Sequence, residues 1–255
     1  MIINKNKQWI LVTGASKGIG FSICQLMLEL NYNVIAVSRD TTTLEELNVD
    51  SEKLLIIPCD LSKNENVFYL FDEIEDFNIT HIFNNAGLGL IGSFAETDIS
   101  KEIAIINTNI SALVILTKLF LQKFNNEKTN GKIINIGSLA GNVSGPLQSV
   151  YYASKAFVNN FTESVQYEMK QENNYGKLIL VLPGQVKTNF RKSAGGKVQE
   201  GYNVYWYVKK LIYLVFHSNK EKIVIGVNHK ITDFFSRLFS SRISKKFLYK
   251  FAKEK

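Results

Sequence analysis

Residues 150–157 read VYYASKAF and place a tyrosine and a lysine four residues apart, Tyr151 and Lys155. Residues at i and i+4 share one face of a helix. The ammonium group would therefore favour the phenolate and lower the tyrosine pKa from its usual value of about 10. A tyrosine tuned in this way can exchange a proton with a carbonyl or alcohol oxygen near neutral pH. Ser138, 13 residues before the tyrosine, would hydrogen-bond the same oxygen.

Two other places in the chain repeat the Tyr-x-x-x-Lys spacing, at 205–209 and 249–253, so the spacing alone does not choose among them. The second even has a serine 13 residues before its tyrosine, Ser236, but within a helical apolar pattern that follows no strand. Ser138 instead ends an apolar segment with the composition of a buried strand. Because parallel sheets present ligand-binding residues at the carboxyl ends of their strands, the pair that follows Ser138 is the predicted reactive pair.

Apolar segments and helical segments alternate along the 255 residues. The apolar segments are rich in Ile, Leu and Val and show little polar alternation, which indicates strands buried on both faces. The predicted fold class is therefore α/β, a doubly wound parallel sheet covered by helices on both sides. The predicted strands lie at 8–13, 33–38, 53–58, 80–85, 132–138, 177–183 and 222–226, and the helices at 18–31, 64–77, 98–125 and 150–173.

Neither an internal repeat nor a linker divides the chain, so residues 1–228 are predicted to form a single domain. Residues 185–221 interrupt the alternation and should cover a substrate at the carboxyl edge of the sheet. The start of the chain lacks the apolar core of a signal peptide, and the two cysteines, Cys24 and Cys59, fall in apolar patterns. Both cysteines are expected to be reduced packing residues, which indicates a cytoplasmic protein.

Residues 229–255 form a tail in which apolar residues at helical spacing alternate with Lys and Arg. The net charge of the chain is +7, and residues 228–255 carry eight Lys or Arg against two acids, which gives +6. The tail is predicted to be a basic amphipathic helix that packs on its own domain or on a partner subunit. Peripheral contact with a membrane surface is the alternative, and nucleic acid is not an expected partner.

The first predicted strand runs directly into the glycine-rich segment VTGASKGIG, residues 12–20. Its glycines let the backbone turn sharply and approach a ligand closely. The helix that begins there would direct its free N–H groups at a phosphate. The spacing is neither a Walker A loop nor the plain G-x-G-x-x-G fingerprint, but its place between a first strand and a first helix predicts a dinucleotide site.

The spacing T-G-x-x-x-G-x-G resembles that of the short-chain dehydrogenase/reductase family, and further motifs follow in the order of that family. NNAG at 84–87 follows the fourth predicted strand, and PGQVKT at 183–188 follows the sixth. The resemblance covers about residues 8–226. It implies a Rossmann fold and an oxidoreductase that transfers a hydride between a nicotinamide and a carbonyl or secondary alcohol. It also implies a homodimer or homotetramer that pairs through the long helices.

Carried over residue by residue, the resemblance implies a catalytic set and a set of cofactor contacts. Tyr151 is the implied proton donor or acceptor, Ser138 holds the substrate oxygen, and Lys155 also holds the nicotinamide ribose. Asn109 would support a water relay to the lysine, with Asn107 as a nearby alternative. No metal site is implied. The implied cofactor contacts are Gly14, Ser16, Lys17, Gly18, Ile19, Gly20, Arg39, Asp60, Leu61, Asn85, Ala86, Gly87, Tyr151, Lys155, Pro183, Gly184, Val186 and Thr188.

The end of the second predicted strand bears on the choice between NADP(H) and NAD(H). NAD-preferring members of the family have an acid there that binds the ribose hydroxyls. Here the position is Ser38, and Arg39 follows, with Lys17 as a second cation in the glycine loop. Both cations could meet a 2′-phosphate, so NADP(H) is the predicted cofactor. Asp40 leaves NAD(H) open, because it could pair with Arg39 or bind the ribose itself.

The substrate pocket should be formed by residues 88–96, 139–148 and 185–206. The lining side chains would be mostly apolar or aromatic, and no cluster of charged residues selects a charged substrate. A ketone, or a 3-oxoacyl or otherwise lipid-like carbonyl compound, is therefore the predicted small-molecule substrate. The expected pocket residues are Leu88, Leu90, Phe94, Leu147, Phe190, Tyr202, Tyr205 and Trp206.

Other classes of protein fit the sequence less well. The segment IGSLAG around Ser138 is close to the G-x-S-x-G elbow of hydrolases but has Ile136 where a glycine is required. An NAD-dependent alcohol dehydrogenase of the same family remains an alternative. So does a dinucleotide-binding sensor or scaffold without turnover, although such a protein would have no need of Ser138, Tyr151 and Lys155 together.

Overall fold

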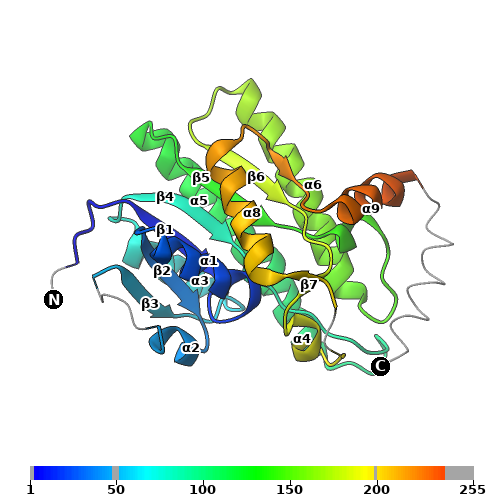
Figure 1. Cartoon of the computed structure of the whole chain (residues 1–255). Helices are drawn as coiled ribbons and strands as arrows, with labels where there is room; N and C mark the ends of the chain where they lie inside the picture. Colours follow the sequence, from blue (N-terminus) through cyan, green and yellow to red (C-terminus); the bar gives the residue numbers. More distant parts are fainter. Residues whose placement is uncertain (1–2, 48–51, 198–199, 239–255) are drawn as a thin grey trace.

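The computed structural model describes residues 3–47, 52–197 and 200–238. Its centre is a seven-stranded sheet in which every pairing is parallel. The order is β3-β2-β1-β4-β5-β6-β9, and helices cover both faces (Figure 1). The predicted doubly wound α/β fold is confirmed. The strands are β1 (Trp9–Thr13), β2 (Asn33–Ser38), β3 (Leu54–Pro58), β4 (Ile79–Asn84), β5 (Lys132–Ile136), β6 (Lys177–Val181) and β9 (Lys222–Ile223).

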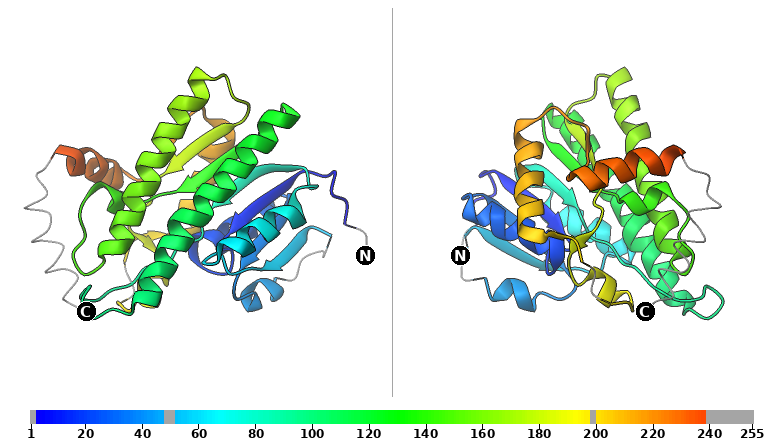
Figure 2. Two further views of the ribbon diagram at one scale, coloured as in Figure 1. Left: turned by 180° about the vertical axis from the view of Figure 1, so that it is seen from behind. Right: turned by 45° about the vertical axis from the view of Figure 1, so that its right-hand side comes forward.

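The strands are apolar on both sides because each side packs against helices. Ile10 and Val12 of β1 belong to the core under α1 (Gly18–Glu29) and α8 (Val204–His217). Trp9 and Leu11, one residue out of step, belong to the opposite core under α3 (Asn64–Ile74), α5 (Ala112–Glu127) and α6 (Ser149–Gln171). This alternation is the period of two that a strand requires. The two helical layers are seen from opposite sides in Figures 1 and 2.

The strand order changes direction between β1 and β4, and this is the place where open α/β sheets bind ligands. The loops after the two strands are tied together there. The hydroxyl of Thr13 accepts a hydrogen bond from Asn85 N at 3.0 Å, and Asn85 Nδ2 donates to Thr13 O at 2.9 Å. These bonds fix the end of the glycine-rich loop relative to the NNAG segment.

The long helix predicted over 98–125 is interrupted in the structure. It consists of α4 (Ile99–Ile106), a π-helical turn η1 (Asn107–Ser111) and α5. Such π turns add a residue to the helix and are frequent at functional sites. By length and composition Ile99–Glu127 could also cross a membrane, but the core helices of soluble proteins pass the same test. Phe120 and Phe124 of this helix are buried in the core against the sheet.

The segment predicted to cover the substrate divides into two parts. Its first part, at the carboxyl edge of the sheet, contains β7 (Val186–Lys187), the short helix α7 (Phe190–Ser193) and β8 (Tyr202–Asn203). β7 and β8 pair with each other in a small separate sheet. The second part is α8, whose Tyr207 and Leu211 are fully buried in the core shared with α1. Only the first part can therefore act as a cover over the sheet edge.

The beginning of the predicted tail packs on the domain as α9 (Val227–Leu238). His229 is buried, and its Nε2 accepts a hydrogen bond from Gln185 N at 3.0 Å. Asp233 accepts a hydrogen bond from Asn142 Nδ2 at 2.9 Å and forms a salt bridge with Lys222 at 3.1 Å. The remainder of the predicted tail, 239–255, lies outside the described residues.

A histidine at the start of β4 makes the stability of the fold sensitive to acid. The ring of His81 stacks on that of Phe216, with centroids 4.4 Å apart, and burial, assisted by the charge of Lys132, lowers the histidine pKa to about 4. In the unfolded chain its pKa is about 6.5. As the pH falls from about 6.5 towards 4, His81 binds a proton in the unfolded state but remains neutral in the folded state. The free energy of unfolding therefore decreases in this pH range.

We expect His81→Phe to remove most of this acid sensitivity. Between pH 7 and pH 5 the wild-type protein should lose about 2 kcal/mol more unfolding free energy than the variant. Urea unfolding at the two pH values measures the difference. His229 is retained in both proteins, so its contribution cancels. His217→Phe, at an exposed position, is the control. An equal pH dependence in wild type and His81→Phe would contradict the assignment to His81.

Candidate active site

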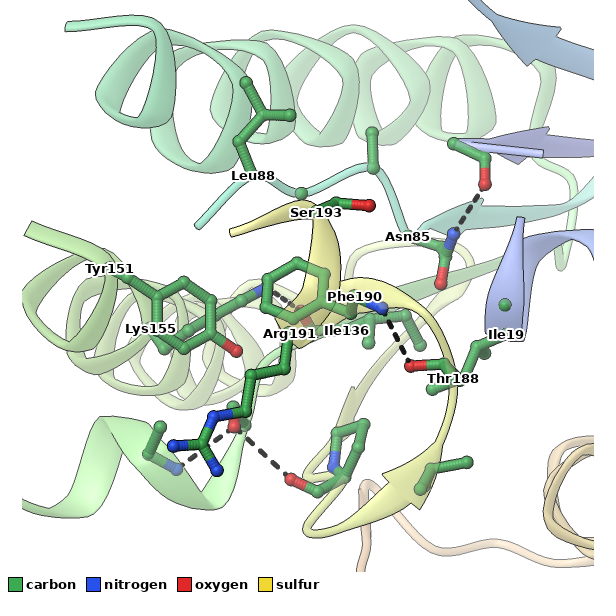
Figure 3. Close-up of a pocket in the computed structure, with 18 of the residues that line it drawn as sticks. Ile19, Asn85, Leu88, Ile136, Tyr151, Lys155, Thr188, Phe190, Arg191 and Ser193 are labelled. Atoms are coloured by element: carbon green, nitrogen blue, oxygen red, sulfur yellow. Dashed lines mark hydrogen bonds between the residues drawn. The ribbon is translucent and has the colours of Figure 1, made fainter. Parts of the chain in front are cut away.

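A cleft of about 1000 Å³ opens at the carboxyl ends of the strands, over the point where the strand order changes direction (Figure 3). Most of the residues singled out in the sequence line it, although they come from segments far apart in the chain. Of the predicted catalytic and cofactor-binding residues, two do not line it, Gly20 and Asn109. The predicted residues that line the cleft are Gly14, Ser16, Lys17, Gly18, Ile19, Arg39, Asp60, Leu61, Asn85, Ala86, Gly87, Ser138, Tyr151, Lys155, Pro183, Gly184, Val186 and Thr188.

The glycine-rich loop has the backbone that its sequence predicts. Gly14 and Gly18 have φ of +65° and +56°, which a residue with a side chain adopts only with strain. A Cβ on Gly14 would lie 2.8 Å from Ala86 Cα, and one on Gly20 would lie 2.2 Å from Gly14 O. Gly20 thus allows tight packing of the loop instead of facing the cleft.

The first turn of α1 is suited to an anion. The helix begins at Gly18, no side chain caps its N-terminus, and its first turn holds no acidic residue. Its N–H groups are therefore available at the cleft, where the helix dipole favours a negative group. A pyrophosphate bound against Gly18 and Ile19 fits this cradle, since the missing side chain at Gly18 leaves room beside Thr188.

The far end of the cleft contains the residues expected to distinguish the two nicotinamide cofactors. The hydroxyl of Ser38 donates to that of Ser16 at 2.8 Å. Asp40 accepts hydrogen bonds from Thr42 and lies 3.6 Å from the ammonium group of Lys17. The bonds from Thr42, with a smaller effect of Lys17, lower the pKa of Asp40. Arg39 is exposed and lines the cleft without a salt bridge to any described residue.

Tyr151 and Lys155 lie together in α6 and face the cleft, as Figure 3 shows. The expected lowering of the Tyr151 pKa is wrong for this structure. Burial raises that pKa to about 12, and the opposing effect of a hydrogen bond with Ser138 is smaller. The ammonium group of Lys155 is directed to the carbonyl oxygen of Ile136, at 2.8 Å, and burial lowers the lysine pKa to about 8. The tyrosine therefore holds its proton at neutral pH.

Asn109 lies in the π turn and holds the loop that contains Leu88. Its Oδ1 accepts from Leu88 N at 2.8 Å, and its Nδ2 donates to Leu88 O at 3.0 Å and to Ser154 Oγ at 2.9 Å. A Cβ on Gly87 would lie 3.6 Å from Asn109 Oδ1 and 3.7 Å from Lys155 Nζ, so the asparagine lies behind the cleft wall near the lysine. Asn107 instead donates to Ser62 O, away from this group.

The residues expected around the substrate divide into those that line the cleft and those that do not. Leu88, Phe190 and Tyr202 line it, and the Phe190 ring lies 5.3 Å from that of Tyr151. The hydroxyl of Tyr205, from the Tyr-x-x-x-Lys match at 205–209, donates a hydrogen bond to Glu29 at 2.7 Å. The expected residues that do not line the cleft are Leu90, Phe94, Leu147, Tyr205 and Trp206.

Several lining residues were not predicted from the sequence. Tyr152, Arg191 and His229 all border the cleft. Tyr152 follows the predicted tyrosine directly, and Arg191 follows Phe190 within the predicted pocket segment 185–206, so proximity in sequence could have suggested both. His229 had no such signal, because it lies in a segment with the pattern of a basic tail.

The chain matches known proteins over most of its length. The family model described as short chain dehydrogenase matches residues 8–199. The oxidoreductase C162.03 of Schizosaccharomyces pombe is 32% identical over 188 residues, which are 72% of this chain and 62% of that protein. The ketoacyl reductase HetN of Nostoc sp. is 32% identical over 166 residues, which are 63% of this chain and 58% of HetN. The matched part thus spans less than two thirds of either relative.

A solved structure agrees with these matches. The closed form of a serine dehydrogenase complexed with NADP+ superposes with a TM-score of 0.75 at 26% identity, covering 85% of this chain and 94% of that one. The glycine-rich loop, the Ser138–Tyr151–Lys155 group and the match over residues 8–199 lead to one conclusion. This chain belongs to the short-chain dehydrogenase family of oxidoreductases.

Proposed function

We propose that the protein is an NADPH-dependent reductase of carbonyl compounds in which Tyr151 donates the proton. The observation that carries the proposal is the meeting of Ser138, Tyr151 and the buried Lys155 in one cleft, with Tyr151 hydrogen-bonded to Ser138. A hydroxyl that keeps its proton at neutral pH suits an acid, and reduction of a carbonyl needs an acid at its oxygen. HetN, described as a ketoacyl reductase, gives this direction further support.

The proposed mechanism assigns one task to each side chain. A bound NADPH would supply the hydride for the carbonyl carbon. Ser138 and Tyr151 donate hydrogen bonds to the carbonyl oxygen, and Tyr151 then transfers its Oη proton to that oxygen as the alcohol forms. The tyrosine is left as a phenolate, which the ammonium of Lys155 stabilises as a nearby opposite charge. Gly18 and Ile19 would hold the pyrophosphate at the N-terminus of α1.

The preference for NADPH rests on the end of β2. Ser38 stands where an acid would bind the ribose hydroxyls, and Arg39 lines the cleft beside it. Asp40 is held by Thr42 and Lys17, which opposes a role in binding ribose. The serine dehydrogenase complexed with NADP+ supports the same choice. An NAD-dependent alcohol dehydrogenase is the alternative. In that case Asp40 would bind the ribose hydroxyls of NAD(H).

We expect Arg39→Ala to weaken NADPH binding by about 10- to 100-fold, the worth of a charge-assisted hydrogen bond to phosphate. NADH, which lacks the 2′-phosphate, should bind the variant and the wild type within about 3-fold of each other by the same reasoning. Fluorescence titration with each cofactor measures both effects. Asp40→Ala tests the alternative. If Asp40→Ala weakens NADH binding while Arg39→Ala leaves NADPH binding unchanged, Asp40 binds the ribose hydroxyls and the protein is NAD-dependent.

A dinucleotide-binding sensor without turnover is the second class to be tested. The test is steady-state consumption of NADPH with a panel of ketones, 3-oxo acids and 3-oxoacyl thioesters. Reductase activity is expected with at least one member. NADPH bound tightly but never consumed would favour the sensor.

The proposal extends to assembly and location. Exposed apolar residues on α4 and α6, such as Ile99, Ile103 and Phe157, support pairing of two copies through the long helices. Light scattering that gave a monomer at micromolar concentration would count against this.

The free cysteines Cys24 and Cys59 support a cytoplasmic location. The exposed Phe234 and Phe235 on α9 support contact with a membrane surface, which liposome flotation can test.

A further inference from the structure

Arg191 lies at the substrate end of the cleft, on the short helix α7. Figure 3 shows its side chain running into the cleft beside Tyr151, from the strand-to-helix turn that also holds Thr188 and Phe190. Phe190, the preceding residue, packs on the Tyr151 ring at 5.3 Å. The neighbouring residue in sequence thus anchors Arg191 next to the proposed proton donor.

The helix that carries Arg191 is fixed to the body of the protein. Ala194, at its end, is buried, and its carbonyl accepts a hydrogen bond from Ile91 N at 2.8 Å. Gly196 N donates to Arg191 O at 2.9 Å. A Cβ on Gly196 would lie 3.1 Å from Arg191 Cγ and 3.2 Å from Nε, so the absence of a side chain there makes room for the arginine stem. The backbone at Gly196 therefore packs against the side chain of Arg191 and helps to fix its direction.

The charges along the cleft are separated by sign. The acids that line it are Asp40 and Asp60, which follow β2 and β3 at the opposite end from Tyr151. The cations near Tyr151 are Lys155 and Arg191. Burial raises the pKa of Tyr152, and the Arg191 charge opposes that rise, as expected of a guanidinium close to Tyr152. Among the described residues that line the cleft, the cations thus lie at the substrate end and the acids at the other end.

Several apolar side chains line this end, beside polar ones such as Gln148 and Ser193. Leu88, Leu139 and Phe190 line the cleft, together with Val143 and Pro146. A guanidinium in a mostly apolar wall recognises a carboxylate well, because the two planar groups form parallel hydrogen bonds and little water competes.

On the basis of the proposed function, we propose that the substrate is an oxo acid and that Arg191 binds its carboxylate while Tyr151 and Ser138 hold its carbonyl oxygen. The carbonyl and the carboxylate would then be separated by a short apolar chain held between Leu88 and Phe190. Arg191 is the residue that distinguishes such an acid from a neutral ketone of the same shape.

The test compares oxo acids with their methyl esters, which keep the carbonyl and lose the charge. Pyruvate, acetoacetate and levulinate place the carboxylate at increasing distances from the carbonyl. For at least one of them the wild-type protein should show a kcat/KM at least about 10-fold higher than for the ester. Arg191→Met should lower the acid-to-ester ratio by about 10- to 100-fold, mainly through KM, as expected for loss of a charge-assisted bond. Arg191→Lys should restore part of it.

Lys192→Met is the matched control, because Lys192 is the next residue, exposed, and outside the cleft lining. It removes one positive charge from the same helix and should leave the ratio unchanged. The proposal is overturned if the wild-type protein prefers all three esters, or if Lys192→Met lowers the ratio as much as Arg191→Met does. Reduction of esters alone would overturn this inference and leave the proposed carbonyl reductase intact.

A binding measurement keeps the inference testable even without turnover. Butanoate has a charged carboxylate where butyramide has a neutral amide of similar size, and NADPH reduces neither compound. With NADP+ present, butanoate should raise the Tm of the wild-type protein more than butyramide does, and this difference should be lost in Arg191→Met. Equal effects of the two compounds on the wild-type protein would overturn the inference. The Tm of each variant without ligand establishes that it is folded.

Discussion

Replacement of Tyr151 by Phe is expected to lower kcat/KM for carbonyl reduction by about 10³-fold, within the range that a positioned acid contributes. Phe retains the ring that packs on Phe190 and Tyr152 but lacks the hydroxyl whose proton burial retains. Binding of NADPH, measured by fluorescence titration, should change by no more than about 3-fold, because the missing group acts on the substrate oxygen. The loss should therefore appear in turnover with the cofactor site intact.

Tyr205→Phe is the control for this result. Tyr205 begins the Tyr-x-x-x-Lys match at 205–209, but its hydroxyl donates to Glu29 at 2.7 Å and does not line the cleft. Its loss should leave kcat/KM within about 2-fold of the wild-type value, as is usual for surface substitutions away from a site. More than a tenth of the activity remaining in Tyr151→Phe would contradict the assignment of the proton donor.

Replacement of Lys155 by Met is expected to lower kcat/KM by about 10²- to 10³-fold, since it removes the charge that stabilises the phenolate left after proton transfer. Unlike Tyr151→Phe, it should also weaken NADPH binding, because the lysine is proposed to hold the nicotinamide ribose. Lys209→Met, which alters the exposed lysine four residues after Tyr205, is the matched control. Cofactor binding unchanged in Lys155→Met would contradict the proposed second role.

The same lysine predicts the pH dependence of the reaction. Burial lowers the Lys155 pKa to about 8, whereas Tyr151 keeps its proton until about pH 12. Below pH 8 both groups are in the form that reduction requires. As the pH rises through 8 the ammonium loses its charge, so kcat/KM should fall by about 10-fold for each pH unit above this value. A constant kcat/KM up to pH 10 would show that Lys155 does not control this limb.

The sheet and the order of its motifs could be predicted because each strand carries its own signal. Strands such as Trp9–Thr13 have apolar residues on both faces, and the glycines of the first loop mark positions with positive φ or close packing. These are local properties of the chain, so the sequence alone suffices to recognise them. The parallel arrangement of the sheet was predicted because the strands alternate with helices, whereas the strand order came from the structure.

Three features of the site depend on contacts between distant segments and were not predicted. The pKa of Tyr151 rises because burial in the cleft outweighs nearby charge, and burial is a property of the whole fold. Arg191 reaches the cleft because Ala194 and Gly196 fix its helix, which no periodic pattern indicates. His229 reaches Gln185 from a segment that has the pattern of a tail. Each required tertiary structure to be found.

The central claim is that the cleft reduces a carbonyl with a hydride from NADPH and a proton from Tyr151. The most direct measurement is to load the wild-type protein with NADPH, add the carbonyl panel, and determine the NADPH consumed and the alcohol formed in the same reaction. With at least one oxo acid or ketone, we predict that one molecule of alcohol forms for each NADPH consumed. In the same time Tyr151→Phe should show neither measurable NADPH consumption nor measurable alcohol formation. NADPH bound tightly but left unconsumed by the whole panel would contradict the claim and favour a dinucleotide sensor.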